Sequence, residues 1–446
     1  MSSRSIALEN LIEILEKERP LHLVLSESLE KIPQTEYNDR AFVSRLTRGV
    51  TERKITLDAV INMLASVKVN KQKPVVRNIL RSGIYQILFM NSVTDFAACD
   101  ESVKLAGKRG FRSLGGFING VLRSCCRRKS EIMESLSDMT LRYSMPEWIV
   151  KDWTQRFGKD KAERAFEYFF EDNGISIRCN LSKTDIASVE KSLGEIEGIS
   201  IEKGLSSKCL KLKKCGSPDE LPGFKQGLFT VQDESSVFAG ICLGIGKATP
   251  EKIKILDLCA APGGKAIHAA DYPGTYITAC DISDDKCGLI REAVKRCGFN
   301  NIEVIRNDAT VFNKDFENRF DCLICDLPCS GLGIIGKKPD IKYNMTPEKM
   351  KELCILQREI LDNAVRYMKP GGVMVFSTCT VDTDENENNV EYLINEKGLV
   401  SDSLDEYLPD IMRGETTKKG YIQILPGEFG CDGFFISRLI KKTNRD

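Results

Sequence analysis

The chain has 446 residues, 42% of them hydrophobic, which predicts two or three domains that can each bury a core. No apolar run approaches the ~18 residues of a membrane-spanning helix. The N-terminal stretch "MSSRSIALENLIEILEKERP" carries acidic residues throughout its apolar pattern, so we expect a soluble cytoplasmic protein with no membrane partner. The 17 cysteines are scattered through a long chain, which favours reduced thiols over a disulfide framework.

Histidine is scarce, and this narrows the possible chemistry. The only two are His22 and His268, which argues against a histidine-based triad and against a multi-histidine metal site. Catalysis must therefore come from Cys, Asp, Glu or Lys.

The net charge is zero, but its sign is unevenly distributed. Residues 1–130 contain 22 Lys and Arg against 13 Asp and Glu, a net charge of +9, so the remainder carries −9. The segment from Lys104 to Lys129 has eight basic residues and no acidic one. Such a face suits a polyphosphate partner, and the plain alternative is a solvated helix surface.

The first 130 residues are predicted to be helical, because apolar residues recur there at helical spacing without strand-like alternation. The clearest segments are 6–16, 40–64, 76–90 and 117–126. Between 131 and 227, helical segments (149–158 and 161–173) mix with short strands (175–181 and 209–215), which indicates a small α+β connector.

From residue 228 onward strands and helices alternate, which is typical of an α/β domain with a doubly wound, mostly parallel sheet. The predicted strands are 252–259, 276–282, 301–308, 320–326 and 371–379, with two further candidates at 421–426 and 433–440. The predicted helices between them include 283–298 and 346–368.

Ligands of such sheets bind at the carboxyl ends of the strands. The first strand is followed by "DLCAAPGGKA", in which Gly263 and Gly264 let the backbone approach a ligand. The loop lacks the G-x-G-x-x-G pattern of dinucleotide sites. It is not a P-loop either, because Cys259 stands where that motif has Gly and Ala266 where it has Ser or Thr.

Acidic residues end the first three predicted strands. Asp281, 24 residues beyond Asp257, is placed to accept hydrogen bonds from ribose hydroxyls, and Asp308 to bind an exocyclic amine. Each could instead be a helix cap. Together with a glycine loop that makes no phosphate cradle, they favour an adenosine ligand without phosphates, and S-adenosylmethionine fits that description.

The fourth strand ends in "CDLPCS" and the fifth in "FSTCT", so Asp326, Cys329 and Cys379 are expected to converge. A thiolate that attacks C6 of cytosine, with N3 protonated, makes C5 nucleophilic, and the C5 proton must later leave. Two thiols and an aspartate could supply these groups. Packing is the alternative for any one cysteine. Cys322 and Cys325 form C-x-x-C, but within a strand they point to opposite faces, which argues against a metal site.

At these residues the chain resembles the NOL/NOP/Sun family of RNA 5-methylcytosine methyltransferases, most closely its RsmB (Sun) branch. The similar motifs are "LDLCAAPGGKA", "DLPCSGLGIIGKKPDIK", "FSTCTVDTDENE" and the closing "CDGFFISRLIKK". The helical N-terminus with "DRAFVSRLTRGV" is similar to the NusB-type RNA-binding domain of that branch. The resemblance implies a class I S-adenosylmethionine-dependent methyltransferase domain with a seven-stranded sheet.

The resemblance also implies roles for individual residues. It makes Cys379 the nucleophile, Cys329 the residue that assists product release, and Asp326 part of the catalytic site. Leu327 stands where many relatives have Ala or Pro. The implied cofactor-binding residues are Cys259, Ala260, Ala261, Pro262, Gly263, Gly264, Lys265, Asp281, Asp308 and Asp326. Past Cys329, the expected phosphate contacts are Lys337, Lys338 and Lys342, with a solvated basic loop as the alternative.

These patterns predict a NusB-like helical domain (1–130), an α+β connector (131–227) and a methyltransferase domain (228–446). The implied partner is 16S ribosomal RNA, naked or partly assembled, with one cytosine drawn out of its stack. We expect a monomer and no DNA partner. Two alternatives stay open: a tRNA substrate, and a non-catalytic RNA-binding factor in ribosome assembly.

Overall fold

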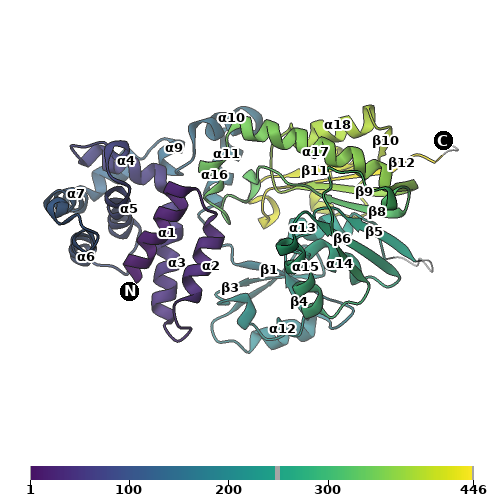
Figure 1. Ribbon diagram of the computed structural model, residues 1–446, viewed down its shortest axis with the longest axis horizontal. Helices are drawn as coiled ribbons and strands as arrows, with labels where there is room; N and C mark the ends of the chain where they lie inside the picture. The colour runs from purple at the N-terminus through teal and green to yellow at the C-terminus, as the bar shows by residue number, and fades with distance from the viewer. Residues whose placement is uncertain (1, 247–251, 444–446) are drawn as a thin grey trace. The chain divides into compact units, whose positions relative to one another are not determined.

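The computed structural model describes residues 2–246 and 252–443 and divides into two compact units (Figure 1). The helical unit comprises residues 1–170 and 335–345, and the sheet unit comprises residues 171–334 and 346–446. In the described part of the chain, no helix is both long and apolar enough to cross a membrane.

The helical unit is built from helices alone among its described residues. The α-helices are α1 (Ser3–Lys17), α2 (Leu21–Glu30), α3 (Tyr37–Glu52), α4 (Lys54–Leu64), α5 (Pro74–Phe89), α6 (Asp95–Lys108), α7 (Gly115–Arg127), α8 (Lys129–Ser135), α9 (Met139–Arg142), α10 (Glu147–Phe157), α11 (Lys159–Tyr168) and α16 (Ile341–Asn344). The short 3₁₀ helices are η1 (Val69–Lys71) and η2 (Arg112–Leu114). The long segment expected at 40–64 is two helices, α3 and α4, which meet at Arg53.

Local sequence explains several helix starts. Pro74 occupies the first turn of α5, where the missing N–H has no intrahelical partner to lose. The Thr94 side chain accepts a hydrogen bond from the Ala97 N–H and so caps α6. The apolar faces of α1, α3, α4, α5, α6 and α7 then meet in one core.

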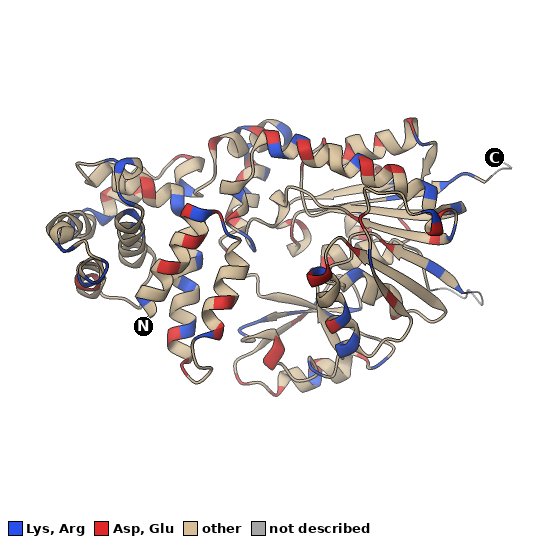
Figure 2. Cartoon of the chain, viewed as in Figure 1, with Lys and Arg blue, Asp and Glu red and all other residues tan. Residues whose placement is uncertain are grey.

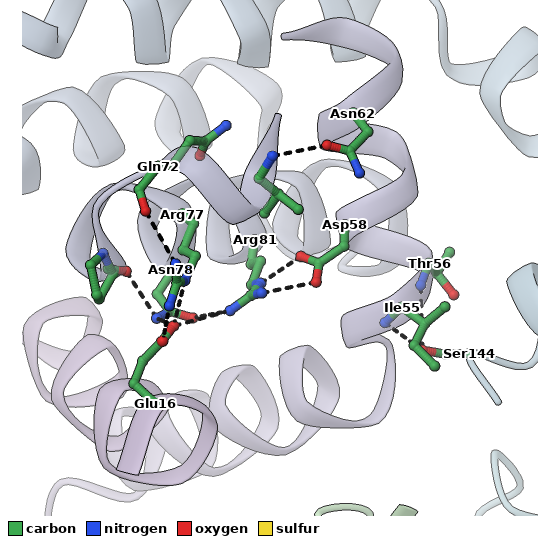
Figure 3. Close-up of polar contacts among 12 residues, drawn as sticks. Glu16, Ile55, Thr56, Asp58, Asn62, Gln72, Arg77, Asn78, Arg81 and Ser144 are labelled. Atoms are coloured by element: carbon green, nitrogen blue, oxygen red, sulfur yellow. Dashed lines mark hydrogen bonds and ion pairs between the residues drawn. The ribbon is translucent and has the colours of Figure 1, made fainter. Parts of the chain in front are cut away.

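A polar cluster ties α1, α4 and α5 together (Figure 3). The buried Arg81 guanidinium donates to both carboxylate oxygens of Asp58, at 2.7 and 2.9 Å. Glu16 accepts hydrogen bonds from Arg77 and, at 2.8 Å, from Asn78. Arg77 and Arg81 therefore pair with acidic residues of the same unit, although both are included in the net charge of +9 of residues 1–130.

Residues 335–345 return to the helical unit nearly 300 residues after its first helices. Lys342 is 2% exposed and its Nζ donates to the Glu52 carbonyl oxygen at 2.8 Å. Burial lowers the pKa of Lys342 to about 7. The expectation that Lys342 contacts RNA phosphate from a surface loop is therefore wrong, whereas Lys337 is exposed and Lys338 half-exposed.

The sheet unit contains a small antiparallel sheet in the region expected to be the connector. Its strands are β1 (Ile175–Cys179), β2 (Ser200–Lys203), β3 (Cys209–Lys213) and β4 (Phe229–Val231), in the order β2-β3-β1-β4. The helix α12 (Ile186–Gly194) and the 3₁₀ helix η3 (Pro218–Glu220) accompany them. The apolar side chains of this sheet and of α12 form their own core.

The large sheet has the order β10-β12-β9-β8-β5-β6-β7, and β11 pairs with β12 as an eighth strand. Its strands are β5 (Ile253–Asp257), β6 (Thr275–Asp281), β7 (Ile302–Arg306), β8 (Phe320–Asp326), β9 (Met368–Thr378), β10 (Leu399–Ser401), β11 (Tyr421–Ile424) and β12 (Phe434–Lys441). Strands β5 to β9 are parallel, and β10, β11 and β12 join by antiparallel pairing. This is the predicted α/β architecture of seven strands with one strand, β10, added.

Helices connect and cover the strands of the large sheet. They are α13 (Glu234–Ile241), α14 (Gly264–Ala270), α15 (Asp284–Cys297), α17 (Pro347–Tyr367), α18 (Glu387–Asn395) and α19 (Glu415–Lys418), with the 3₁₀ helices η4 (Lys314–Phe316), η5 (Leu332–Ile334), η6 (Asp410–Met412) and η7 (Glu428–Gly430). Ile255 and Leu256 of β5 belong to separate apolar clusters, as expected for a strand buried on both faces.

The division of the chain differs from the boundaries expected at residues 130 and 227. Helices α9, α10 and α11 lie in the helical unit, whereas the small sheet lies in the same unit as the large one.

Candidate active site

Two thiols meet beyond the carboxyl ends of neighbouring strands. Asp326 ends β8 and is paired with Ser377 of β9, so the loops that follow these strands start side by side. Cys329 and Cys379 lie in those loops, and their Sγ atoms are 3.4 Å apart. The convergence expected from the sequence is therefore present in the structure.

The surroundings of Cys329 favour its protonated form. Its hydrogen bond with Cys379 and its burial raise the pKa of the Cys329 thiol, and the nearby carboxylates of Glu385 and Asp326 act in the same direction. Cys329 is therefore held as a thiol.

Asp326 connects the thiols to the loop after β5. Its Oδ2 accepts a hydrogen bond from Lys265 Nζ at 2.7 Å, and its Oδ1 accepts one from Ser377 Oγ at 2.8 Å. Lys265, one of the expected cofactor-binding residues, is largely buried, and its ammonium group forms an ion pair with Asp326. These two hydrogen bonds hold the Asp326 carboxylate in place at the strand end.

The segment of residues 259–265 runs from the loop after β5 into the first turn of α14. Gly263 has φ of +108°, a conformation that L side chains rarely adopt, so glycine is required there by the backbone. The buried Asp281, at the end of β6, accepts hydrogen bonds through Oδ2 from the Ala261 N–H at 3.1 Å and through Oδ1 from the Ile282 N–H at 2.8 Å. Asp281 therefore fixes the loop beside its own carboxylate.

Asp257, the last residue of β5, belongs to the three acids at the strand ends but not to the expected cofactor-binding residues. It is 1% exposed, and burial raises its pKa to about 8, which the charge of Lys265 opposes only in part. Neither carboxylate oxygen has a partner in normal hydrogen-bonding geometry among the described residues, although the Cys259 amide lies near enough to offset a little of the effect. Its place as the first acid after a buried strand was the signal that could have singled it out.

Asp308 follows β7 and is exposed. Its Oδ1 accepts hydrogen bonds from the Thr310 N–H at 3.0 Å and from Thr310 Oγ1 at 2.7 Å. In the described structure it therefore stabilises a turn and caps no helix, and its binding of an amine stays a prediction.

Cys322 and Cys325 take no part in this site. They lie in β8, and they belong to the apolar clusters on opposite faces of the large sheet. Across residues 2–246 and 252–443, no group of three or more His, Cys, Asp or Glu side chains is placed to hold a metal ion.

Comparisons with known proteins agree with this architecture. Residues 247–440 match the family model of the 16S rRNA methyltransferase RsmB/F, and residues 1–127 match that of the NusB family. The chain is 35% identical over 451 residues to the probable ribosomal RNA small subunit methyltransferase B of Bacillus subtilis (strain 168), covering 99% of both chains. It is 31% identical to the protein of the same name from Synechocystis sp., covering 99% of this chain and 100% of that one.

Solved structures are similar as well. The crystal structure of PH0851 has a TM-score of 0.80 at 25% identity and covers 99% of each chain. That of NSun6 from Pyrococcus horikoshii with SFG has a TM-score of 0.58 at 21% identity, covers 67% of this chain and 99% of its own, and shows a shared fold. With the two thiols, the glycine loop and the full-length relatives in agreement, the chain belongs to the RsmB branch of the 16S rRNA methyltransferase RsmB/F family and carries a NusB-family domain at its N-terminus.

Proposed function

We propose that this chain transfers a methyl group from S-adenosylmethionine to C5 of a cytosine in 16S ribosomal RNA. The observation that carries the chemistry is the pair of thiols, Cys329 and Cys379, 3.4 Å apart beside Asp326. The choice of substrate rests on the family, whose model and relatives are named for ribosomal RNA of the small subunit.

The loop of residues 259–265 and the acids at the strand ends fit the cofactor. Asp281 is buried at the end of β6, where a carboxylate can accept hydrogen bonds from ribose hydroxyls. Gly263 and Gly264 let the backbone come close to a ligand, and Asp308 is the candidate for an exocyclic amine. S-adenosylmethionine, when bound, supplies an electrophilic methyl group.

Cys379 is the nucleophile in this proposal. Its Sγ forms a bond to C6 of the cytosine while the proton of the Cys379 thiol passes through Asp326 to N3. The ring then becomes an enamine whose C5 is nucleophilic enough to accept a methyl group. Lys265 Nζ donates a hydrogen bond to the Asp326 carboxylate at 2.7 Å and keeps it in place.

Product release requires loss of the C5 proton to a base. The bond between C6 and the Cys379 sulfur then breaks with its electron pair on sulfur, and the proton on N3 returns to that sulfur. Cys329 assists this step. The raised pKa of Cys329 supports this role, because a thiol that holds its proton is a poor initial nucleophile. The product then carries a methyl group in place of the C5 hydrogen.

Methylation of purified RNA tests the proposal. The protein and S-adenosylmethionine are incubated separately with deproteinised 16S RNA, small-subunit particles and tRNA, and the nucleosides are analysed by mass spectrometry. We expect 5-methylcytidine in 16S RNA or its particle. Its appearance in tRNA alone would support the tRNA alternative, and no methylated nucleoside in any substrate would favour a non-catalytic assembly factor.

A further inference from the structure

Hydrogen bonds hold the residues on both sides of Cys329. Gln357 of α17 donates from Nε2 to the Pro328 carbonyl oxygen at 2.9 Å. The Ser330 N–H donates to Oε2 of Glu385 at 2.9 Å. Both side chains are fully buried, and Gln357 Nε2 also donates to the same Glu385 oxygen at 2.9 Å. The backbone that carries Cys329 is therefore fixed before and after the thiol.

The loop that carries Cys379 is held in the same manner by Asn386, the residue that follows Glu385. Asn386 Oδ1 accepts a hydrogen bond from Thr378 Oγ1 at 2.5 Å, and Asn386 Nδ2 donates to the Thr380 carbonyl oxygen at 3.1 Å. The same Nδ2 donates to Gln423 Oε1 at 2.7 Å, which fixes the orientation of the amide. Asn386 is also fully buried.

The two sets of contacts are joined to each other. Glu385, which contacts the loop of Cys329, and Asn386, which contacts the loop of Cys379, are adjacent in sequence, so a shift of one residue also moves the other. The hydroxyls of Ser330 and Thr380, which directly follow the two cysteines, are 2.7 Å apart. Asn389 of α18 completes the network by donating to Gln357 Oε1 at 2.8 Å.

Close backbone packing adds a second constraint. The Gly333 N–H donates to the Cys379 carbonyl oxygen at 3.0 Å. A Cβ at Gly333 would lie 2.8 Å from that oxygen and 2.1 Å from the Gly433 carbonyl oxygen, so no side chain fits between the loops. Buried networks of this kind lose much of their order when one member is removed, because its partners are left unpaired in a medium of low dielectric.

We propose that Glu385 and Asn386, together with Gln357, are positioning residues that set the separation of the two thiols and so prepare them for the two halves of the methylation cycle. The inference rests on the proposed function for its chemical meaning. The geometric claim, that Glu385 controls the distance between Cys329 and Cys379, can be tested without RNA or cofactor.

Phenylarsine oxide provides the geometric test, because its arsenic binds two thiols that lie close together. Two S–As bonds form, the two thiol protons leave with the oxide oxygen as one water, and no redox change occurs. The adduct is mapped by mass spectrometry of the peptides that contain Cys329 and Cys379. Cys99 and Cys126, whose sulfurs lie 3.9 Å apart in the helical unit, give an internal reference within the same protein.

We expect Glu385→Ala to slow formation of the adduct on Cys329 and Cys379 at least tenfold while leaving the reference adduct unchanged. Glu385→Gln should restore it, because the amide oxygen can accept the hydrogen bonds from Ser330 and Gln357. Asp384→Ala is the matched control, since that neighbouring carboxylate is exposed and bonds Asn388 instead. If the reference adduct is also lost in Glu385→Ala, the protein has unfolded, and Gln357→Met decides in its place.

Kinetics give the second readout. In methylation assays Glu385→Ala and Gln357→Met should lower kcat at least tenfold and change KM for RNA less than twofold, with Glu385→Gln near the wild type. Wild-type adduct rates and kcat in both Glu385→Ala and Gln357→Met would overturn the positioning role. Absence of methylation by the wild type would instead overturn the proposed function, and the arsenical measurement would still stand.

Discussion

At the scale of single residues, Lys342 illustrates how burial changes the meaning of a charge. Its Nζ lies 5.4 Å from the centre of the Tyr343 ring and 5.7 Å from that of Phe170, and it donates to the Glu52 carbonyl oxygen. In the sequence this lysine stands among other basic residues of a polar stretch, where a surface role is the natural interpretation. Its partner is 290 residues away, a separation over which local pattern carries no information.

The lowered pKa of Lys342 predicts a specific dependence of stability on pH. Between about pH 7 and its ordinary pKa of about 10.4, the unfolded chain binds a proton that the folded chain does not. The free energy of unfolding of the helical unit should therefore rise with pH across this window, by at most about 5 kcal/mol from this group. Below pH 7 the full cost of burying the charge remains.

Denaturant unfolding at pH 7 and pH 9.5 measures this effect. We expect Lys342→Met to flatten the rise, because the buried titrating group is gone. Lys337→Met, a change at an exposed position of the same segment, should keep the slope of the wild type. An equal slope in wild type and Lys342→Met would contradict the placement of this lysine.

At the scale of elements, the basic segment of residues 104–129 separates into two groups. Four of its side chains form ion pairs with acids of the helical unit: Lys104, Arg109, Arg128 and Lys129. Four others are exposed, and the described residues offer them no ion pair: Lys108, Arg112, Arg123 and Arg127. Charges of both signs lie along the helices of this unit (Figure 2). The second group on α6, η2 and α7 is therefore the best candidate for phosphate contacts.

Salt dependence of RNA binding distinguishes the two groups. Neutralising Arg112, Arg123 and Arg127 to Gln should weaken binding and reduce the slope of log K against log salt by about 2, because each phosphate contact adds roughly 0.7–0.9. Neutralising Lys104, Arg128 and Lys129 to Gln is the control of equal charge and should change the slope little. The same loss of slope in both variants would show that net charge, and not this surface, governs binding.

The elements themselves were largely predictable. Long segments with apolar residues at helical spacing predicted α1, α5, α15 and α17, and short apolar runs predicted β5 to β9. Both patterns can be read locally because a face that packs against the core is mostly apolar. Strand β10 has three residues, too few for a pattern, and it exists through antiparallel pairing with β12. The break between α3 and α4 at Arg53 was not predicted, because no proline or glycine stands at that position.

At the scale of the whole molecule, the meeting of Cys329 and Cys379 was predictable because the topology rule for parallel sheets places the ends of neighbouring strands at one edge. The residues that hold the pair were not. Glu385 and Asn386 lie in "DTDENE", which has the composition of a solvated loop, yet both are fully buried. Their partners come from other loops and from α17, and only the folded chain brings these together.

The division of the chain was also beyond local pattern. Residues 335–345 belong to the helical unit because they contact Arg48 and Glu52, and the local sequence pattern does not predict these contacts. Removal of residues 1–130 would take away these partners, so point variants of the full chain are the cleaner test of RNA binding.

The central claim is that Cys379 attacks the RNA and Cys329 releases it, and trapping of the covalent adduct tests it most directly. Cys329→Ala, Cys379→Ala and the double variant are incubated with labelled substrate RNA and S-adenosylmethionine, and label retained on denatured protein is measured. We predict a stable RNA adduct with Cys329→Ala and none with Cys379→Ala or the double variant. An adduct that accumulates with Cys379→Ala and is absent from Cys329→Ala would contradict this assignment.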